Sequence, residues 1–127
     1  MTTRRRGLGD LGERLAAEHL LAHGYTIRER NWRVPHLGEL DIVAEENGCL
    51  VFIEVRTRRG DSYGTPEASI TQAKKLRLVH LAMAYRQAHA NAPLPENERI
   101  DVVAVELSPA GRLLRIDIVR NAVGGDG

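Results

Sequence analysis

The sequence has 127 residues, 43% hydrophobic and 28% charged, and its 18 Lys and Arg against 17 Asp and Glu give a formal net charge of +1. This length suits one domain with its own core, and the charge balance excludes a protein that coats polyanions through bulk positive charge. A single cysteine, Cys49, excludes an intramolecular disulfide. No apolar run in the sequence is long enough to span a membrane and no apolar segment follows the basic residues near the start, so we expect a cytoplasmic protein without a membrane partner.

Residues 8–23 have the pattern of an amphipathic helix, because leucines and alanines recur on one broad arc and Gly24 follows as a stop signal. Glu13 lies on the flank of that arc. From there its carboxylate can reach over a sheet packed against the helix. An ordinary surface ion pair of Glu13 with Arg14 or Arg30 explains the same position equally well.

Three strands are predicted next. Residues 25–33 alternate polar and apolar side chains, and residues 39–46 and 49–57 form a hairpin around Asn47-Gly48. Asn-Gly is the dipeptide most typical of a two-residue hairpin turn, in which both residues take positive φ. Such a turn fixes which residues of the two strands face each other.

In the register of this hairpin, Asp41 lies directly opposite Glu54, and Glu39 opposite Arg56. Opposed side chains of an antiparallel pair have Cβ atoms about 4.5–5.5 Å apart, so the two carboxylates repel unless a cation lies between them. The other face of the hairpin is apolar and must be buried, which prevents a slip of the register. That face consists of Leu40, Ile42, Ala44, Val51, Ile53 and Val55.

Hard cations such as Mg²⁺ are held by one or two carboxylates, with water and phosphate in the remaining positions. The opposed Asp41 and Glu54 therefore indicate a metal site suited to phosphodiester chemistry. The alternative is that one acid pairs with an arginine while the other lies at a solvated strand end.

A second helix is expected over residues 71–87. Its apolar residues cover most of the helix circumference, so we expect it to be largely buried against the sheet. Its first turn carries Gln72, Lys74 and Lys75. Because the free amides and dipole of a helix N-terminus favour anions, a phosphate near this end has a physical rationale.

Residues 58–66 are rich in Gly, Ser, Asp and Pro and predict an irregular loop beside the acids. Residues 99–107 and 112–119 predict a second hairpin. The order is therefore α-β-β-β-α-β-β, and two helices can cover both faces of such a sheet, so the expected fold is α/β, a three-layer α/β/α sandwich with a mixed five-stranded sheet. We expect flexible ends at residues 1–7 and 121–127.

A first-helix glutamate, an aspartate on one strand and Glu-x-basic on the next resemble the PD-(D/E)xK nuclease superfamily, with its restriction-endonuclease-like fold. The chain also contains a series of short motifs: Gly9-Asp10-Leu11-Gly12-Glu13, Gly24-Tyr25, Arg30-Asn31, GELDIVA at 38–44, VFIEVRTR at 51–58, the helix around Lys74, IDVV at 100–103 and Asn121-Ala122. Through these motifs, which span nearly its whole length, the chain resembles one branch of that superfamily, the YraN family of small bacterial proteins. The resemblance implies a single nuclease-like domain over residues 1–127, nucleic acid as the partner, and a likeness to Holliday-junction resolvases.

Carried over position by position, the resemblance makes Glu13, Asp41 and Glu54 the acidic residues of a site for Mg²⁺ or Mn²⁺. The backbone carbonyl of Val55 is a further ligand in this scheme.

The chain departs from the family pattern at Arg56, where the pattern has lysine. Lysine can lose its proton when desolvated and help to activate water, whereas arginine stays protonated and instead holds a phosphate or an oxyanion. Either water is activated without this side chain, or Lys74 or Lys75 replaces it, or the protein binds without cutting. We expect Arg56, Arg58, Gln72, Lys74 and Lys75 to contact the nucleic acid.

The preferred interpretation is a Mg²⁺- or Mn²⁺-dependent DNA endonuclease that hydrolyses phosphodiester bonds, with branched DNA as a candidate substrate and Glu13, Asp41, Glu54 and Arg56 as its catalytic residues. The alternative, which Arg56 favours, is a non-catalytic nucleic-acid-binding module that retains the nuclease fold. A structural or protein-interaction domain is a third class of function, which no motif in the sequence supports. RNA stays an alternative to DNA, and a homodimer suits a two-stranded or branched substrate.

Overall fold

The computed structural model describes residues 6–60 and 64–123. Its elements, in chain order, are α1 (Arg6–Ala22), β1 (Thr26–Val34), β2 (Gly38–Glu46), β3 (Cys49–Arg59), the short 3-10 helix η1 (Glu67–Ser69), α2 (Gln72–Ala88), β4 (Asn97–Leu107) and β5 (Leu113–Val119). The predicted α/β class and the order of helices and strands are confirmed. Sequence analysis missed η1, and it ended β3 early, because pairing with β4 continues this strand to Arg59.

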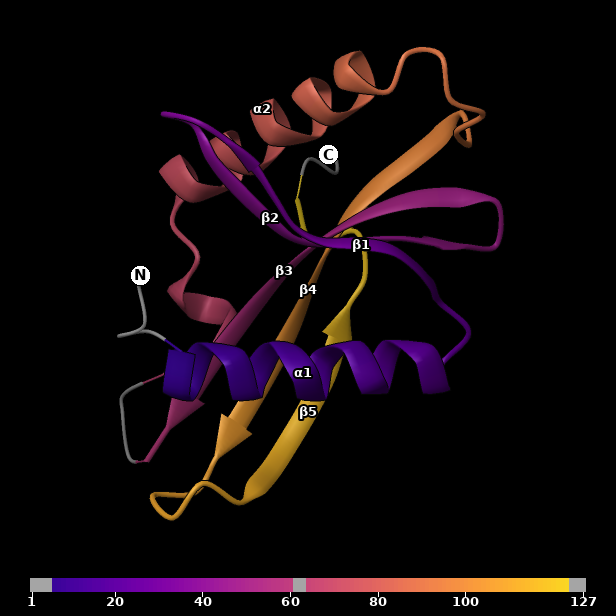
Figure 1. Ribbon diagram of the computed structural model, residues 1–127. Coiled ribbons are helices and arrows are strands. Elements are labelled where there is room, and N and C mark those ends of the chain that lie inside the picture. The colour runs from indigo at the N-terminus through magenta and orange to yellow at the C-terminus, as the bar shows by residue number, and fades with distance from the viewer. Residues whose placement is uncertain (1–5, 61–63, 124–127) are drawn as a thin grey trace.

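The five strands form one mixed sheet in the order β1-β2-β3-β4-β5. Strands β3 and β4 are parallel, and the other neighbouring pairs are antiparallel. A parallel pair needs a long crossover connection, which here contains α2. Helices α1 and α2 cover opposite faces of the sheet, so the fold has three layers (Figure 1).

Each face of the sheet carries its own apolar cluster. Ala16 and Leu20 of α1 pack on the face that includes Ile42, Val51 and Ile53. On the other face, residues of α2 pack against β2, β3 and β4; the buried members are Leu40, Val43, Leu50, Phe52, Leu78, Leu81, Ala82, Tyr85, Ile100 and Val123.

The prediction that Leu40 shares a face with Ile42 is wrong, because Leu40 belongs to the α2 cluster. The end of the β1–β2 hairpin curves toward α2 (Figure 1), and the backbone position of Gly38 lies close to Arg77 and Leu81 of that helix. Strand twist thus turns Leu40 to the side that simple alternation assigns to its neighbours.

The prediction of a largely buried α2 is also wrong. Leu78 and Tyr85 are buried against the sheet, but Leu76 and Met83 are 57% and 62% exposed. The apolar residues do surround the helix, and the sheet covers one side of it.

The segment after β5 is tied to β4, because the N–H of Asn121 donates to the buried carboxylate of Asp101 at 2.8 Å. Gly7 lies within α1. The flexibility expected at residues 1–7 and 121–127 stays a prediction, and residues 1–5 and 124–127 of these ends lie outside the described residues. Neither α-helix in the described ranges is long and apolar enough to cross a membrane.

Candidate active site

The hairpin of β2 and β3 has the predicted turn. Asn47 and Gly48 both have positive φ, 50° and 72°, as a two-residue hairpin turn requires. Glu46 faces Cys49 across the turn, which confirms the predicted register as far as Ile42 and Ile53. The ladder of paired residues ends at Ile42 and Ile53, one position before Asp41 and Glu54. The predicted pair of Glu39 and Arg56 lies beyond this ladder, and Glu39 instead forms an ion pair with Arg33.

Where this ladder ends, a side chain replaces the backbone pairing. The backbone N–H of Val55 on β3 donates a hydrogen bond to the carboxylate of Asp41 on β2 at 2.8 Å. Strand β3 continues its pairing with β4 as far as Arg59. The sheet therefore opens between β2 and β3 at the position of Asp41 and Glu54.

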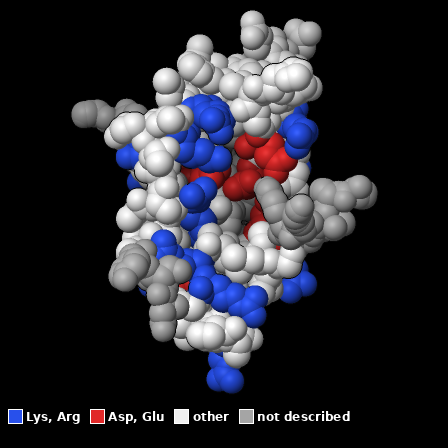
Figure 2. All heavy atoms as spheres, turned by 90° about the vertical axis from the view of Figure 1, so that its left-hand side faces the viewer, with Lys and Arg blue, Asp and Glu red and all other residues white. Residues whose placement is uncertain are grey.

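A cleft of about 990 Å³ lies at this opening. It brings together most of the predicted site residues: Glu13, Asp41, Glu54, Val55, Arg56, Arg58 and Lys74. Asp and Glu side chains lie in a hollow of this face with Lys and Arg beside them (Figure 2). Gln72 and Lys75 are not among the lining residues, and contact with nucleic acid stays a prediction for all five residues expected to make it.

Asp41 is electrostatically unfavourable as a carboxylate. Burial and the negative charge of Glu54 raise the pKa of Asp41 to about 8, and the hydrogen bond from Val55 offsets this only in part. In the described part of the chain, Asp41 has no ion-pair partner. A cation between Asp41 and Glu54 would lower this electrostatic free energy.

Glu54 has two cationic neighbours. Its side chain is 4% exposed, and Oε2 lies 3.2 Å from Nη1 of Arg56 and 3.5 Å from Nζ of Lys74. Thr71 positions this lysine by capping α2, since its Oγ1 accepts a hydrogen bond from the N–H of Lys74 at 3.1 Å. The alternative of an acid paired with an arginine therefore applies to Glu54 but not to Asp41.

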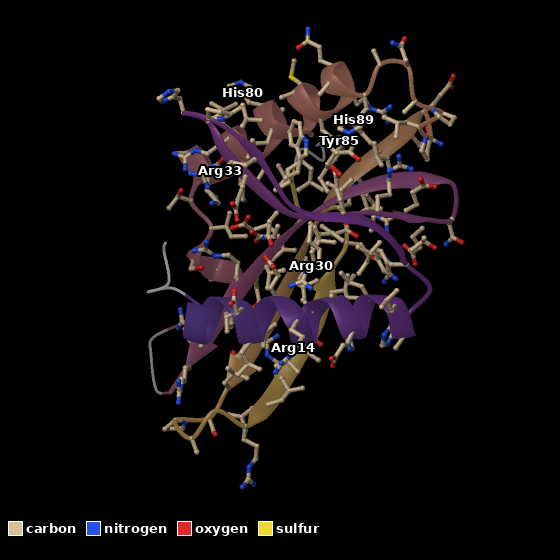
Figure 3. All side chains as sticks on the ribbon, in the orientation of Figure 1. Arg14, Arg30, Arg33, His80, Tyr85 and His89 are labelled. Carbon is tan, nitrogen blue, oxygen red and sulfur yellow. The ribbon has the colours of Figure 1, made fainter. Side chains whose placement is uncertain are left out.

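Glu13 is held by two side chains of β1. Nη2 of Arg30 donates to Oε1 at 2.9 Å and Nδ2 of Asn31 donates to Oε2 at 2.9 Å. Arg30 reaches from the sheet toward α1 (Figure 3). Of the two arginines named for a surface ion pair, Arg30 forms the pair, but the Glu13 side chain is only 12% exposed and also lines the cleft.

Asn31 is a site residue that the sequence analysis named in a motif but gave no role. It has a positive φ of 55°, and its amide lies 3.5 Å from Oε2 of Glu39 in addition to its bonds with Glu13. Asn31 thus connects acids of α1 and β2. An asparagine within a predicted strand is a sequence signal for such a positive φ, because asparagine tolerates the left-handed region better than most residues.

Gly12 brings α1 close to β3. A Cβ atom at this position would lie 1.9 Å from Oγ1 of Thr57. The helix therefore approaches the strand directly beside Glu13. A glycine within an otherwise periodic helix pattern is the signal for such contact.

The other lining residues that sequence reasoning missed come from several elements. Leu8, Arg33, Pro66 and Ser69 were not considered as site residues. Gly9, Asp10, Gly38, Glu39 and Thr57 were quoted in motifs or placed on the hairpin but given no role. Figure 3 shows Arg33 at the end of the β1–β2 hairpin, near the start of α2. Nη1 of Arg33 lies 3.5 Å from Oε1 of Glu39, with which it forms an ion pair.

Within the described ranges, no group of three or more His, Cys, Asp and Glu side chains is arranged to hold a metal ion. Glu13 has both carboxylate oxygens engaged by β1 side chains. Asp41 and Glu54 remain as two carboxylates on one cleft. This set fits Mg²⁺ or Mn²⁺, because such hard cations take one or two carboxylates and fill the other positions with water and phosphate.

The model of the uncharacterised protein family UPF0102 matches residues 12–105. A UPF0102 protein of Symbiobacterium thermophilum is 48% identical over 117 residues, which cover 92% of this chain and 96% of the relative. A UPF0102 protein of Roseiflexus castenholzii is 47% identical over 125 residues, covering 97% and 98%. One of Clavibacter michiganensis is 46% identical over 120 residues, covering 94% and 98%. These names state a family and no activity.

Proposed function

We propose that this chain, which belongs to the uncharacterised protein family UPF0102 (the YraN family), is a Mg²⁺- or Mn²⁺-dependent endonuclease that hydrolyses phosphodiester bonds of DNA. The proposal rests on the environment of Asp41, whose carboxylate lies beside Glu54 and has a pKa raised to about 8. A carboxylate in this position is unfavourable in the metal-free protein, and a divalent cation is the ligand that relieves it.

Asp41 and Glu54 hold the cation in this proposal. When bound there, a divalent cation favours the ionised form of water and neutralises charge on the phosphate in the transition state. Glu13, fixed by Arg30 and Asn31, orients the attacking water. The carbonyl of Val55 remains a candidate further ligand.

Arg56 and Lys74 bind the phosphate. Both are within 3.5 Å of Glu54 and both are 30% exposed, so each can face the cleft and a bound anion. Arg56 acts as a permanent cation and not as a base, because arginine stays protonated. Arg58 lines the same cleft and extends this basic side.

The charge of the cleft argues for metal-dependent DNA binding. Among the described residues that line it, five are acids, namely Asp10, Glu13, Glu39, Asp41 and Glu54, and four are bases, namely Arg33, Arg56, Arg58 and Lys74. DNA phosphates are repelled by the acids until a cation neutralises them. A non-catalytic binding module, which Arg56 favours, would instead bind DNA equally well in EDTA.

The test is cleavage of labelled four-way junction, flap, duplex and single-stranded DNA, with RNA in parallel, in Mg²⁺, Mn²⁺ or EDTA. We expect metal-dependent products from the wild-type protein and from Glu18→Gln, an exposed carboxylate of α1 that serves as matched control. Asp41→Asn is expected to remove the products. DNA that is retarded but uncut, to the same extent in EDTA, would support the binding module and overturn the endonuclease.

A further inference from the structure

Arg56, the residue that replaces the motif lysine, is fixed at two of its three guanidinium nitrogens. Nη1 donates to Glu54 at 3.2 Å and Nε donates to Oγ of Ser69 at 3.0 Å. Ser69 donates its own proton to the carbonyl of Pro66 at 2.6 Å, so its oxygen lone pairs are left for Arg56. Among the described residues, Nη2 of Arg56 has no hydrogen-bond partner.

Ser69 lies on η1, and charge holds this short helix in place. None of the three residues of η1 is buried. Glu67 of η1 instead accepts two hydrogen bonds from Arg115 on β5, at 2.9 and 3.4 Å. Arg115 also contacts Glu106 at 2.9 Å and Asp117 at 2.6 Å, and it lowers the pKa of Glu67. Three acids therefore hold the Arg115 side chain, and Arg115 holds η1 against β4 and β5.

We propose that η1 is a clamp that fixes the guanidinium of Arg56 beside Glu54, with Ser69 as its positioning residue and Arg115 as its anchor. The inference rests on the proposed function and adds that the phosphate-binding cation of this site is preorganised. A lysine has one nitrogen on a flexible stem and cannot bridge Glu54 and Ser69 as the planar guanidinium does. A fixed donor needs no reorganisation when charge develops on the phosphate, which is how preorganised sites accelerate reactions.

The first arm of the test is nuclear magnetic resonance of the metal-free protein and does not depend on activity. The order parameter of the Arg56 Nε–Hε bond is measured, with the resonance assigned through Arg56→Lys. We expect a rigid value, about 0.85, in wild type and in Ser69→Thr, and a value below about 0.6 in Ser69→Ala and Arg115→Gln. Arg112→Gln, at an exposed arginine just before β5, is the matched control and keeps the wild-type value. An unchanged order parameter in Ser69→Ala would overturn the clamp.

The second arm is steady-state cleavage in Mn²⁺, with Mn²⁺ affinity measured by calorimetry. Ser69→Ala and Arg115→Gln are expected to lower kcat about tenfold with unchanged Mn²⁺ affinity, and Ser69→Thr is expected to restore kcat. A loss of Mn²⁺ affinity together with kcat, or no rescue by threonine, would mean a merely structural role and contradict the proposal. A wild-type protein that does not cut would overturn the endonuclease alone, and the order parameters would still decide the clamp.

Discussion

Asp41 and Val55 are joined by a 2.8 Å hydrogen bond from a backbone N–H of β3 to a carboxylate of β2, at the position where the backbone ladder between these strands ends. This bond directs Asp41 toward β3 and keeps it beside Glu54. The result is a half-buried carboxylate whose pKa is raised to about 8. In the metal-free protein the ionised form of Asp41 is therefore destabilised, and a bound cation would remove this destabilisation.

Asp41→Asn is expected to stabilise the metal-free protein at high pH. Folding raises the pKa of Asp41 from 3.8 to about 8. Protonation of Asp41 therefore adds to the free energy of unfolding below about pH 4, and this contribution is lost as the pH rises to about 8. Asparagine carries no charge and can still accept the N–H of Val55. In urea denaturation at about pH 9, the unfolding free energy of the variant should exceed that of wild type by about 1–2 kcal/mol, and the difference should vanish near pH 4. A variant less stable than wild type at pH above 8 would refute the electrostatic account.

Gly12→Ala tests the close approach of α1 to β3. The added Cβ meets Thr57 at 1.9 Å, so we expect a loss of about 1–3 kcal/mol in unfolding free energy. Gly9→Ala is the matched control on the same helix, because a Cβ there meets nothing within 4 Å. It should gain up to about 1 kcal/mol from helix propensity. Equal effects of the two substitutions in thermal or urea denaturation would show that the contact at Gly12 does not matter.

Asn31→Gly is expected to lower kcat about tenfold while changing stability by less than about 1 kcal/mol. Glycine accepts the positive φ of this position but removes the amide that holds Glu13. Asn47→Gly, at a second asparagine with positive φ, lies in the β2–β3 turn and serves as the control in the same cleavage assay. If both variants cut DNA at the wild-type rate, Asn31 does not position Glu13 for the reaction.

Arg56→Lys restores the lysine of the family pattern, yet we expect it to lower kcat by about tenfold or more, since lysine cannot contact Glu54 and Ser69 together. Arg59→Lys is the matched control, because Arg59 donates to the carbonyl of Pro109 and does not line the cleft. Single-turnover cleavage distinguishes the variants. A more active Arg56→Lys protein would mean that the site works through a titratable lysine at this position.

The hairpin register was predictable because local chemistry decides it. Asn47-Gly48 sets the turn, and the register that it fixes holds from Glu46 and Cys49 to Ile42 and Ile53. Asp41 and Glu54 lie just beyond this ladder, where both line the cleft. The exposure of Leu76 and Met83 was not predictable in this way. The sequence shows that apolar residues surround this helix, but it does not show that other elements cover only one side of it.

The supports of the site were missed because they depend on contacts far apart in sequence. Arg115 holds Glu67 from 48 residues away, and Asn31 holds Glu13 from 18 residues away. The position of Leu40 likewise depends on the twist of the whole sheet. Such relationships appear only once the strands are placed in space.

Calorimetric titration of Mn²⁺ into wild type, Asp41→Asn and Glu18→Gln in the absence of DNA tests the metal site most directly. We expect saturable binding to wild type and to Glu18→Gln, and loss of that binding in Asp41→Asn. Equal Mn²⁺ affinity in Asp41→Asn, or no saturable binding to the wild-type protein, would contradict a metal site built on Asp41 and Glu54.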